Sequence, residues 1–462
     1  MPDLRKKIFE NGKTVSKKAR SRQQSAQPSP ASSRGGSRAA SRQASDEEDV
    51  SDYEYNDSLP ASTLNSEGSD DEGESISPSE ALHDQIVDLL DQKRDSGQDR
   101  ENKLIAYTEL IRHNFSAEEI DGRVNDLLPM LLKSIRGRKT PQGTLWALRA
   151  LALTIVTTGG ETIHDRVYST LQTLCESTEY DDFNEEIKVG CIRAMGLSTM
   201  CGGGSATAAA EFLQFLMEII QSDGHVVEAG DSGPVVAAAL DAWGFVASGL
   251  DDLEEESTEA LEAFTEQLDS TDVDVQIAAG ANIALLLEAA REHEDGGGEP
   301  WNMRYDQDQL LQRLTSLTRE SSKSISKKDR RRLHDGFRSV VTSLEHGKGP
   351  GYSTARRLAS NPHTGGNKAD FNQEYQEYGY RQRYRIQNIS LIIDTWSLST
   401  RIGMLKTVLG SGLASHYLYN PVVKDLLNGA RAEYISAPAK SRSTRKQEWK
   451  VHGKKATKGV SS

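Results

Sequence analysis

Apolar residues recur every three or four positions from residue 80 to residue 346, which is the spacing of amphipathic helices. Within this region, four segments are apolar on nearly every side, as expected of helices that are buried between neighbours. Each of them places a small residue at the same point, and these residues are 44, 48 and 40 positions apart. The segments are 146–156, 191–200, 239–248 and 280–289, and the small residues are Ala152, Gly196, Gly244 and Ala284. The pattern therefore indicates an internal helical repeat.

Less apolar helices are predicted between these segments, for example over 162–177 and 257–269, as in the outer layer of a stacked array. A small residue in the middle of a helix lets the neighbouring helix approach closely. Strand signals are negligible here. We therefore predict that residues 80–295 form a right-handed α-solenoid of roughly four to five armadillo or HEAT units. Residues 306–346 continue it as one long helix or two helices in series, so the predicted repeat domain covers 80–346.

The only convincing strand pattern follows the repeats. Residues 347–379 are rich in Gly, Ser and Asn, which predicts a flexible loop. Apolar and polar residues then alternate over 380–396 on both sides of Gln387 and Asn388, which predicts a short β-hairpin that turns at these two residues.

Two further helices are predicted after this hairpin. The first should end at Gly410, because glycine is favoured directly after a helix, and the second should begin at Asn420 and Pro421, a cap followed by a first-turn proline. Hairpin and helices make up a small, mainly helical C-terminal domain over 380–435. The predicted fold class is therefore all-α, with one short hairpin.

Both ends of the chain lack apolar periodicity. Residues 1–79 and 436–462 cannot bury enough apolar surface to offset their ordering entropy, so we predict that both are disordered. Residues 1–43 hold 11 Lys and Arg against 2 acids, whereas residues 44–80 hold 13 acids and no base. Four serines near these acids are candidates for phosphorylation by an acidophilic kinase: Ser45, Ser51, Ser66 and Ser69. A tail that only aids solubility is an equally good interpretation.

The formal charge of −14 is an average over segments of opposite sign. Residues 81–300 hold 15 bases against 41 acids, whereas residues 301–435 hold 21 against 12 and residues 436–462 hold 8 against 1. An acidic body with a basic C-terminal third predicts interactions with partners. One face of the repeats is expected to bind basic proteins, although a merely solvated acidic surface is the alternative.

The densest basic cluster opens an apolar-faced helix in the sequence SKKDRRRLHDGF, and its members are Lys327, Lys328, Arg330, Arg331 and Arg332. They cannot all pair with Asp329 and Asp335. Cations in the first turn of a helix also oppose its dipole, if the helix begins here and not upstream. RNA phosphates are the obvious counter-charge, because neutralising them releases counterions. A nuclear localisation signal and docking on the acidic repeats are the alternatives.

A second basic segment interleaves tyrosines with Arg381, Arg383 and Arg385 over residues 374–385. Aromatic rings among arginines suit base stacking and phosphate contact in single-stranded RNA. No RNA-recognition motif accompanies the segment, so an ordinary amphipathic strand is the favoured interpretation.

Two motifs together carry a resemblance to a known family. The basic start SKKDRRRLHDGFRSVV, followed by DTWSLSTRIGMLKTVLGSG over 394–412, resembles the interferon-related developmental regulator family. The resemblance covers roughly residues 80–435 and implies an armadillo-like domain followed by the family's C-terminal domain.

The resemblance implies a non-enzymatic regulator of gene expression. Members are linked to binding of non-translating ribosomes through rRNA and ribosomal proteins, and alternatively to transcriptional co-regulation in a nuclear complex. Carried over to this chain, RNA contact is expected at Lys327, Lys328 and Arg330–Arg332, and also at Arg401 and Lys406. The basic tail loosely resembles that of the family and adds five candidates: Arg442, Arg445, Lys446, Lys454 and Lys455.

Enzyme signatures are absent from the sequence, including the phosphate loop, HExxH and CxxC motifs. Three cysteines are too few and too unevenly spaced for a zinc site or a disulfide framework. No secretory signal or long apolar span is visible. We therefore expect no catalysis, metal, cofactor, small-molecule substrate or membrane, and a cytoplasmic location that leaves a nuclear one open.

Overall fold

The computed structural model describes most of the chain from residue 77 to residue 434. The described ranges are 77–91, 96–137, 140–177, 184–319, 325–358 and 375–434. The predicted disordered tails, 1–79 and 436–462, lie outside these ranges except for residues 77–79. There the first helix already begins at Pro78, two residues earlier than expected.

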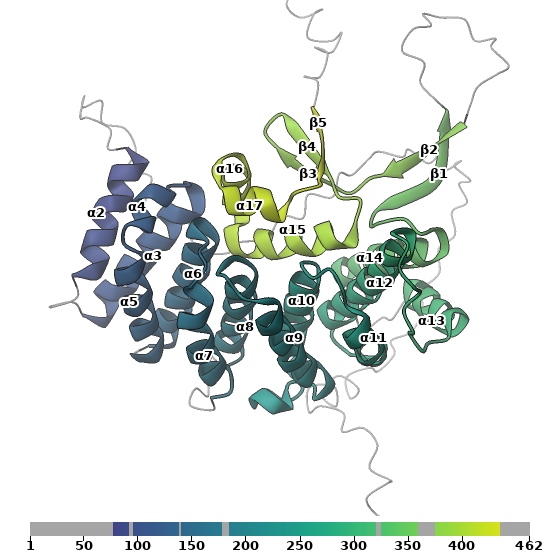
Figure 1. Ribbon diagram of the computed structural model, residues 1–462, viewed down its shortest axis with the longest axis horizontal. Coiled ribbons are helices and arrows are strands. Elements are labelled where there is room, and N and C mark those ends of the chain that lie inside the picture. Colours follow the sequence, from purple (N-terminus) through teal and green to yellow (C-terminus); the bar gives the residue numbers. More distant parts are fainter. Residues whose placement is uncertain are drawn as a thin grey trace, which may run out of the picture. The chain divides into compact units, whose positions relative to one another are not determined.

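Helices follow one another from α2 to α12 in the expected repeat region, and no strand occurs among its described residues (Figure 1). Serine and threonine caps start several of them, because their side chains accept backbone N–H groups of the first turn. The first helices are α2 (Pro78–Leu90), α3 (Gly97–His113), α4 (Ala117–Asp121) and α5 (Val124–Gly137). The next are α6 (Pro141–Thr158), α7 (Ile163–Cys175), α8 (Asn184–Cys201), α9 (Ala206–Gln221), α10 (Gly233–Ala247), α11 (Glu254–Gln267) and α12 (Val273–Asp295), with a 3-10 turn at His225–Val227.

The most apolar helices form the inside of the stack, as the sequence predicts. α6 packs on α8, α8 on α10 and α10 on α12. The less apolar helices lie outside them, with α7 packed mainly on α8, α9 on α10 and α11 on α12. By length and composition α12 could cross a membrane, but two thirds of its apolar window is buried inside the fold. This burial identifies it as a core helix.

The small residues that define the repeat lie where helices approach closely. A Cβ atom placed on Gly244 of α10 would come within 2.3 Å of Oδ1 of Asn282 in α12. The side chain of Asn282 donates in turn to the carbonyl of Leu240 at 2.8 Å, so the absence of a side chain at Gly244 makes room for this link. The equivalent residues Ala152 and Ala284 are buried as well.

The region 306–346 forms two helices in series, α13 (Gln307–Arg319) and α14 (Lys327–His346), which settles the alternative that the sequence left open. They pack on each other, and α14 also packs on α12. Their apolar faces close the end of the stack with buried side chains: Leu310, Leu314, Leu333, Phe337 and Val340.

Five strands follow among the described residues, more than the sequence predicted. The expected hairpin is present as β3 (Arg383–Ile386) and β4 (Ile389–Ile392), and Gln387 turns the chain with a φ of 50°. A third strand, β5 (Arg431–Tyr434), pairs antiparallel with β4. The prediction of a flexible loop over 347–379 is wrong at both ends, because β1 (Tyr352–Leu358) pairs antiparallel with β2 (Tyr375–Tyr380).

The C-terminal helices share the core of the repeats. α15 (Trp396–Leu409) packs on α6, α10 and α12, and the short α16 (Leu413–Tyr419) and α17 (Pro421–Leu426) pack on α3 and α6 (Figure 1). The indole Nε1–H of Trp396 donates to Oγ of Ser343 in α14 at 2.9 Å. The buried His416 contacts the carbonyl of Ile111 at 2.9 Å through Nε2. The predicted boundary between 80–346 and 380–435 therefore does not coincide with a break in the core.

Candidate nucleic-acid interface

The basic cluster lies at the beginning of a helix and not in its middle. α14 starts at Lys327, where Ser326 caps it by accepting the backbone N–H of Asp329 at 3.0 Å. All five cations therefore fall within the first two turns. Those in the first turn oppose the helix dipole at a cost of about 0.3–1 kcal/mol each, so the dipole argument made from the sequence applies.

Three of the five cations face solvent. Lys327, Lys328 and Arg331 are exposed, and neither lysine forms a hydrogen bond or ion pair with any residue that the structure describes. Arg331 lies 3.9 Å from the carboxylate of Asp335 one turn later, in an exposed pair of little energetic value. These three side chains keep their charge available to an external partner.

The other two cations are engaged within the fold. Nη2 of Arg332 lies 2.5 Å from Oδ1 of Asp274, in the first turn of α12, and its Nη1 lies 3.7 Å from Asp329. Arg330 donates to the carbonyl of Ile325 at 3.5 Å. Arg332 thus makes the kind of contact that the alternative of docking on the acidic repeats predicts. Lys327 and Lys328 make no such contact with a residue that the structure describes.

The strand β3 presents its two arginines on one face. Arg383 and Arg385 are exposed and alternate with Tyr384 and Ile386, which face the core. Arg383 pairs with Glu433 of β5, two strands away in the sheet. Of these two arginines, Arg385 lacks a carboxylate partner among the described residues, and its guanidinium donates weakly to the carbonyl of Gln387 at 3.4 Å.

Each tyrosine ring that the structure describes in this region lies under a cation of the same chain. Arg381 lies 5.3 Å above Tyr378, Arg431 lies 5.5 Å above Tyr380, and Lys348 lies 5.6 Å above Tyr352. The rings of Tyr352 and Tyr380 also meet edge to face at 5.0 Å. Such contacts stabilise a strand surface by themselves. They favour the interpretation of this segment as an amphipathic strand, because these tyrosine rings are already covered and are less available to stack on RNA bases.

Arg401 and Lys406, which the family resemblance assigned to RNA, are built into the fold. Arg401 donates to Oγ of Ser248 at 3.0 Å, to the carbonyl of Ser248, and to the carbonyl of Leu426 at 3.3 Å. Lys406 lies 4.6 Å above the ring of Tyr384, and burial lowers its pKa. Arg401 therefore tethers α15 to the end of α10, and its assignment as an RNA contact stays a prediction.

Several predicted positions lie outside the described residues. These are the tail cations Arg442, Arg445, Lys446, Lys454 and Lys455, and the candidate phosphoserines Ser45, Ser51, Ser66 and Ser69. The three cysteines, by contrast, are all described and buried, and burial raises the pKa of the Cys175 and Cys201 thiols to about 12. Among the described residues, no three His, Cys, Asp or Glu side chains gather as metal ligands would.

Sequence reasoning missed two kinds of residue. Lys348 covers the ring of Tyr352 from only four residues away, and sequence reasoning overlooked this local pair. Arg431 covers the ring of Tyr380 from 51 residues away, so only the fold reveals that contact. A local excess of bases at the start of the repeats was hidden by the total charge of residues 81–300. A charge count over shorter windows would have found it.

A family model described as interferon-related developmental regulator matches residues 47–345. The matched part includes the repeats and the basic cluster of α14, and it ends before the strands and α15. The second quoted motif, over 394–412, therefore lies outside the match.

Relatives extend the similarity in different degrees. An uncharacterized protein of Schizosaccharomyces pombe is 27% identical over 361 residues, which is 75% of this chain and 74% of that protein. Interferon-related developmental regulator 1 of Mus musculus is 28% identical over 159 residues, and interferon-related developmental regulator 2 of the same species is 29% identical over 159 residues. These mammalian alignments cover 34% of this chain and 28% of each relative.

Proposed function

The chain belongs to the interferon-related developmental regulator family, and from this premise we propose that it is a non-enzymatic regulator of gene expression that binds the ribosome. In this proposal the first turns of α14 contact rRNA phosphates, and the acidic repeats hold basic segments of ribosomal proteins. The bound protein would repress translation by occupying the path of mRNA or tRNA. No reaction, metal or cofactor takes part.

The observation that carries the proposal is the exposed part of the α14 cluster. Lys327, Lys328 and Arg331 stand next to one another at a helix start that repels positive charge, and no described carboxylate neutralises the two lysines. Cations at the start of a helix destabilise the free protein slightly, and binding of a polyanion would offset this cost. Arg332, tied to Asp274, fixes the direction of this helix start on the repeats.

The acidic surface of the repeats supports a second contact. The described part of residues 81–300 carries most of its carboxylates on exposed helix faces, for instance Glu254, Glu255 and Glu262 of α11. Basic protein segments are attracted to such a surface, and the attraction adds to encounter rate and specificity. The rival role, a nuclear scaffold for transcription, would use this same surface without the α14 cations.

Co-sedimentation with purified ribosomes separates the two roles. The full-length protein is mixed with salt-washed 80S particles, and bound protein is measured in the pellet. The test variant carries Lys327→Ala, Lys328→Ala and Arg331→Ala, all three at exposed positions. The proposal expects about tenfold weaker binding for this variant, which corresponds to about 1.4 kcal/mol.

A matched control removes three exposed cations elsewhere, through Arg304→Ala, Arg338→Ala and Lys424→Ala. This control has the same net charge as the test variant, and Arg338 lies on α14 itself. Binding of the control at the wild-type level assigns the effect to the cluster. Equal losses in both variants, or no binding by the wild-type protein, would overturn the ribosome proposal and favour the nuclear scaffold.

A further inference from the structure

The start of the repeat array reverses the charge of the region around it. Residues 123–173 hold seven bases and three acids, whereas the remainder of residues 81–300 holds eight bases and 38 acids. These bases include Lys133 and Arg136 near the end of α5 and Arg166 in α7. The proposed ribosome contact uses none of them.

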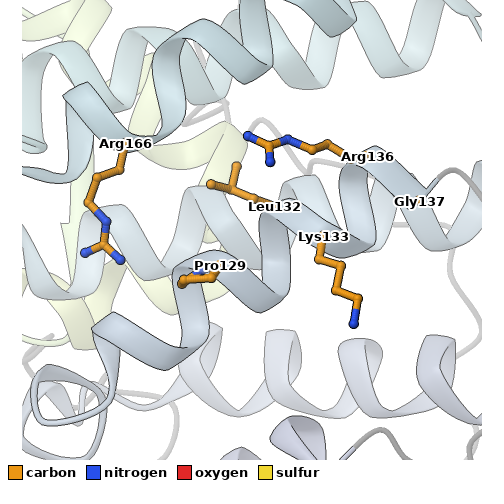
Figure 2. A pocket seen from close by; sticks show the side chains of 6 residues that line it. All are labelled: Pro129, Leu132, Lys133, Arg136, Gly137 and Arg166. Atoms are coloured by element: carbon orange, nitrogen blue, oxygen red, sulfur yellow. The ribbon is translucent and has the colours of Figure 1, made fainter.

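Three of the bases surround a pocket between α5 and α7. The pocket has a volume of about 540 Å³ and is lined by Pro129, Leu132, Lys133, Arg136, Gly137 and Arg166. Figure 2 shows Arg166 on one helix and Arg136 on the other, with Leu132 and Pro129 between them, while the Lys133 side chain leaves α5 in a different direction from Arg136. A second hollow of about 320 Å³ continues past Arg136 along α7.

The two arginines of this pocket are held in place by neutral partners. Arg136 donates to Oγ1 of Thr170 at 2.6 Å, and Arg166 donates to Oδ1 of Asn125 at 3.0 Å. Lys133 forms no hydrogen bond or ion pair with a described residue, and no described carboxylate pairs with any of the three. The acids on the same helices, Asp126 and Asp165, are exposed and leave these charges unpaired. Neutral partners that orient arginines leave their charge available to an anionic ligand.

We propose that the pocket, with Lys133, Arg136 and Arg166, binds the acidic segment 44–76 of the same chain. That segment, which lies outside the described residues, holds 12 Asp and Glu and no Lys or Arg. Eight of these acids lie in two runs, DEED at 46–49 and DDEGE at 70–74. Phosphorylation at Ser66 or Ser69 would add about two negative charges each beside the second run.

The point at which this segment joins the fold favours binding within one molecule. Residue 76 directly precedes Ser77, the cap of α2, and α2 packs on α5, the helix that carries Lys133 and Arg136. A random coil of 33 residues, the length of this segment, has a root-mean-square end-to-end distance of about 30 Å. Tethering at this range produces an effective concentration of about a millimolar, which a free competitor does not reach.

The attachment point of the tail also makes the α14 cluster a less favoured binding site for it. α14 packs on α12, and α12 is separated from α5 by α10, α8 and α6 in the order of packing. The pocket lies beside the attachment point of the tail, whereas the α14 cluster lies at the other end of the stack. The acidic tail and rRNA thus have separate basic sites.

Zero-length cross-linking tests the proposal on the full-length protein without ribosomes. A carbodiimide joins a carboxylate to a lysine amine as an amide and takes up the lost water to become a urea. Lys133 is the one lysine that lines the pocket, so mass spectrometry should find amides between Lys133 and acids of 44–76. A mixture of isotopically light and heavy protein should show that these links form within one molecule.

The test variant carries Arg136→Glu and Arg166→Glu and keeps Lys133. We expect it to lose these cross-links about tenfold, because two attractive charges become repulsive. The control, Arg149→Glu with Arg304→Glu, makes the same charge change at exposed positions outside the pocket and should retain them. Equal circular dichroism melts establish that both variants are folded.

Three cross-linking outcomes would overturn the proposal. They are cross-links of the tail to Lys327 or Lys328 in place of Lys133, links only between molecules, or undiminished links in the Arg136→Glu, Arg166→Glu variant. A different result would assign the pocket to RNA instead. In that case the cross-link between the tail and Lys133 is absent, and added poly(U) protects Lys133 from acetylation. Ribosomes are absent throughout, so failure here is separate from failure of the proposed function.

Discussion

Oε1 of Glu288 in α12 accepts the backbone N–H of Trp396 at 2.6 Å, although 108 residues separate the two. The same oxygen lies 3.3 Å from the backbone nitrogen of Ser397. A buried carboxylate thus caps the first turn of α15, where the helix dipole favours a negative charge. Burial nevertheless dominates over these hydrogen bonds and raises the pKa of Glu288 to about 7. The tie between the repeats and the C-terminal helices is therefore sensitive to pH.

The first prediction follows from that pKa. The folded value of about 7 exceeds the ordinary value of 4.5, so the contribution of Glu288 to stability is fully present below pH 4.5 and is lost as the pH rises through 7. Glu288→Gln keeps an oxygen acceptor but cannot ionise. Relative to wild type, it should gain stability on the order of 3 kcal/mol between pH 4.5 and pH 8. Urea unfolding of both proteins at the two pH values measures this difference, and an identical difference at both would contradict the assignment.

A second prediction concerns the close approach of α16 to α3. A Cβ atom on Gly412 would lie 1.7 Å from the carbonyl oxygen of Arg112, which is backbone and cannot move aside. Gly412→Ala should therefore cost about 1–3 kcal/mol of stability. Gly403→Ala on the exposed side of α15 has open space around its Cβ and should stabilise by about 0.5–1 kcal/mol. Thermal unfolding of the pair gives the answer, and equal melting temperatures would refute the close approach.

A third prediction tests the structural role of Arg401. Arg401→Ala removes its hydrogen bonds to Ser248 and Leu426 and leaves these partly buried acceptors unpaired, so stability should fall by about 2–3 kcal/mol. Ribosome binding at a temperature where the variant is folded should remain within about twofold of wild type. Unchanged stability together with weakened binding would restore Arg401 as an RNA contact.

Much of the fold could be predicted from local patterns in the sequence. The apolar periodicity and the recurring small residues located the buried helices. A helix covered on both sides must be apolar all round and must carry small side chains where its neighbours approach closely. The alternation of apolar and polar residues around Gln387 located the β3–β4 hairpin, because successive side chains of a strand point to opposite faces of the sheet. Glycine and proline punctuation located the ends of α15 and the start of α17.

What the sequence missed depends on contacts between distant segments. Strand β5 has a single short run of four exposed residues, and only its pairing with β4 makes it a strand. Strand β1 is polar on both faces and lacks the alternation that marks a half-buried strand. Arg401 carries the same charge as the cations of α14, and only its neighbours distinguish a tether from a ligand contact. Likewise, the carboxylate partner of Arg332 is 58 residues away.

A fourth prediction uses the salt dependence of ribosome binding. Each phosphate that a cation neutralises contributes about 0.7–0.9 to the slope of log affinity against log salt concentration. The variant with Lys327→Ala, Lys328→Ala and Arg331→Ala should therefore lower the slope by about 2–3. The Arg304→Ala, Arg338→Ala, Lys424→Ala control should keep the wild-type slope. A test variant with weaker binding but an unchanged slope would indicate that these residues do not contact phosphates.

Sedimentation of cell lysate tests the central claim most directly. Lysates of growing and starved cells that express wild-type protein, or the variant with Lys327→Ala, Lys328→Ala and Arg331→Ala, are run on sucrose gradients and blotted for the protein. The account predicts that wild-type protein travels with 80S particles, more so after starvation, and that the variant stays at the top. Wild-type protein at the top of the gradient in both growth states would contradict it.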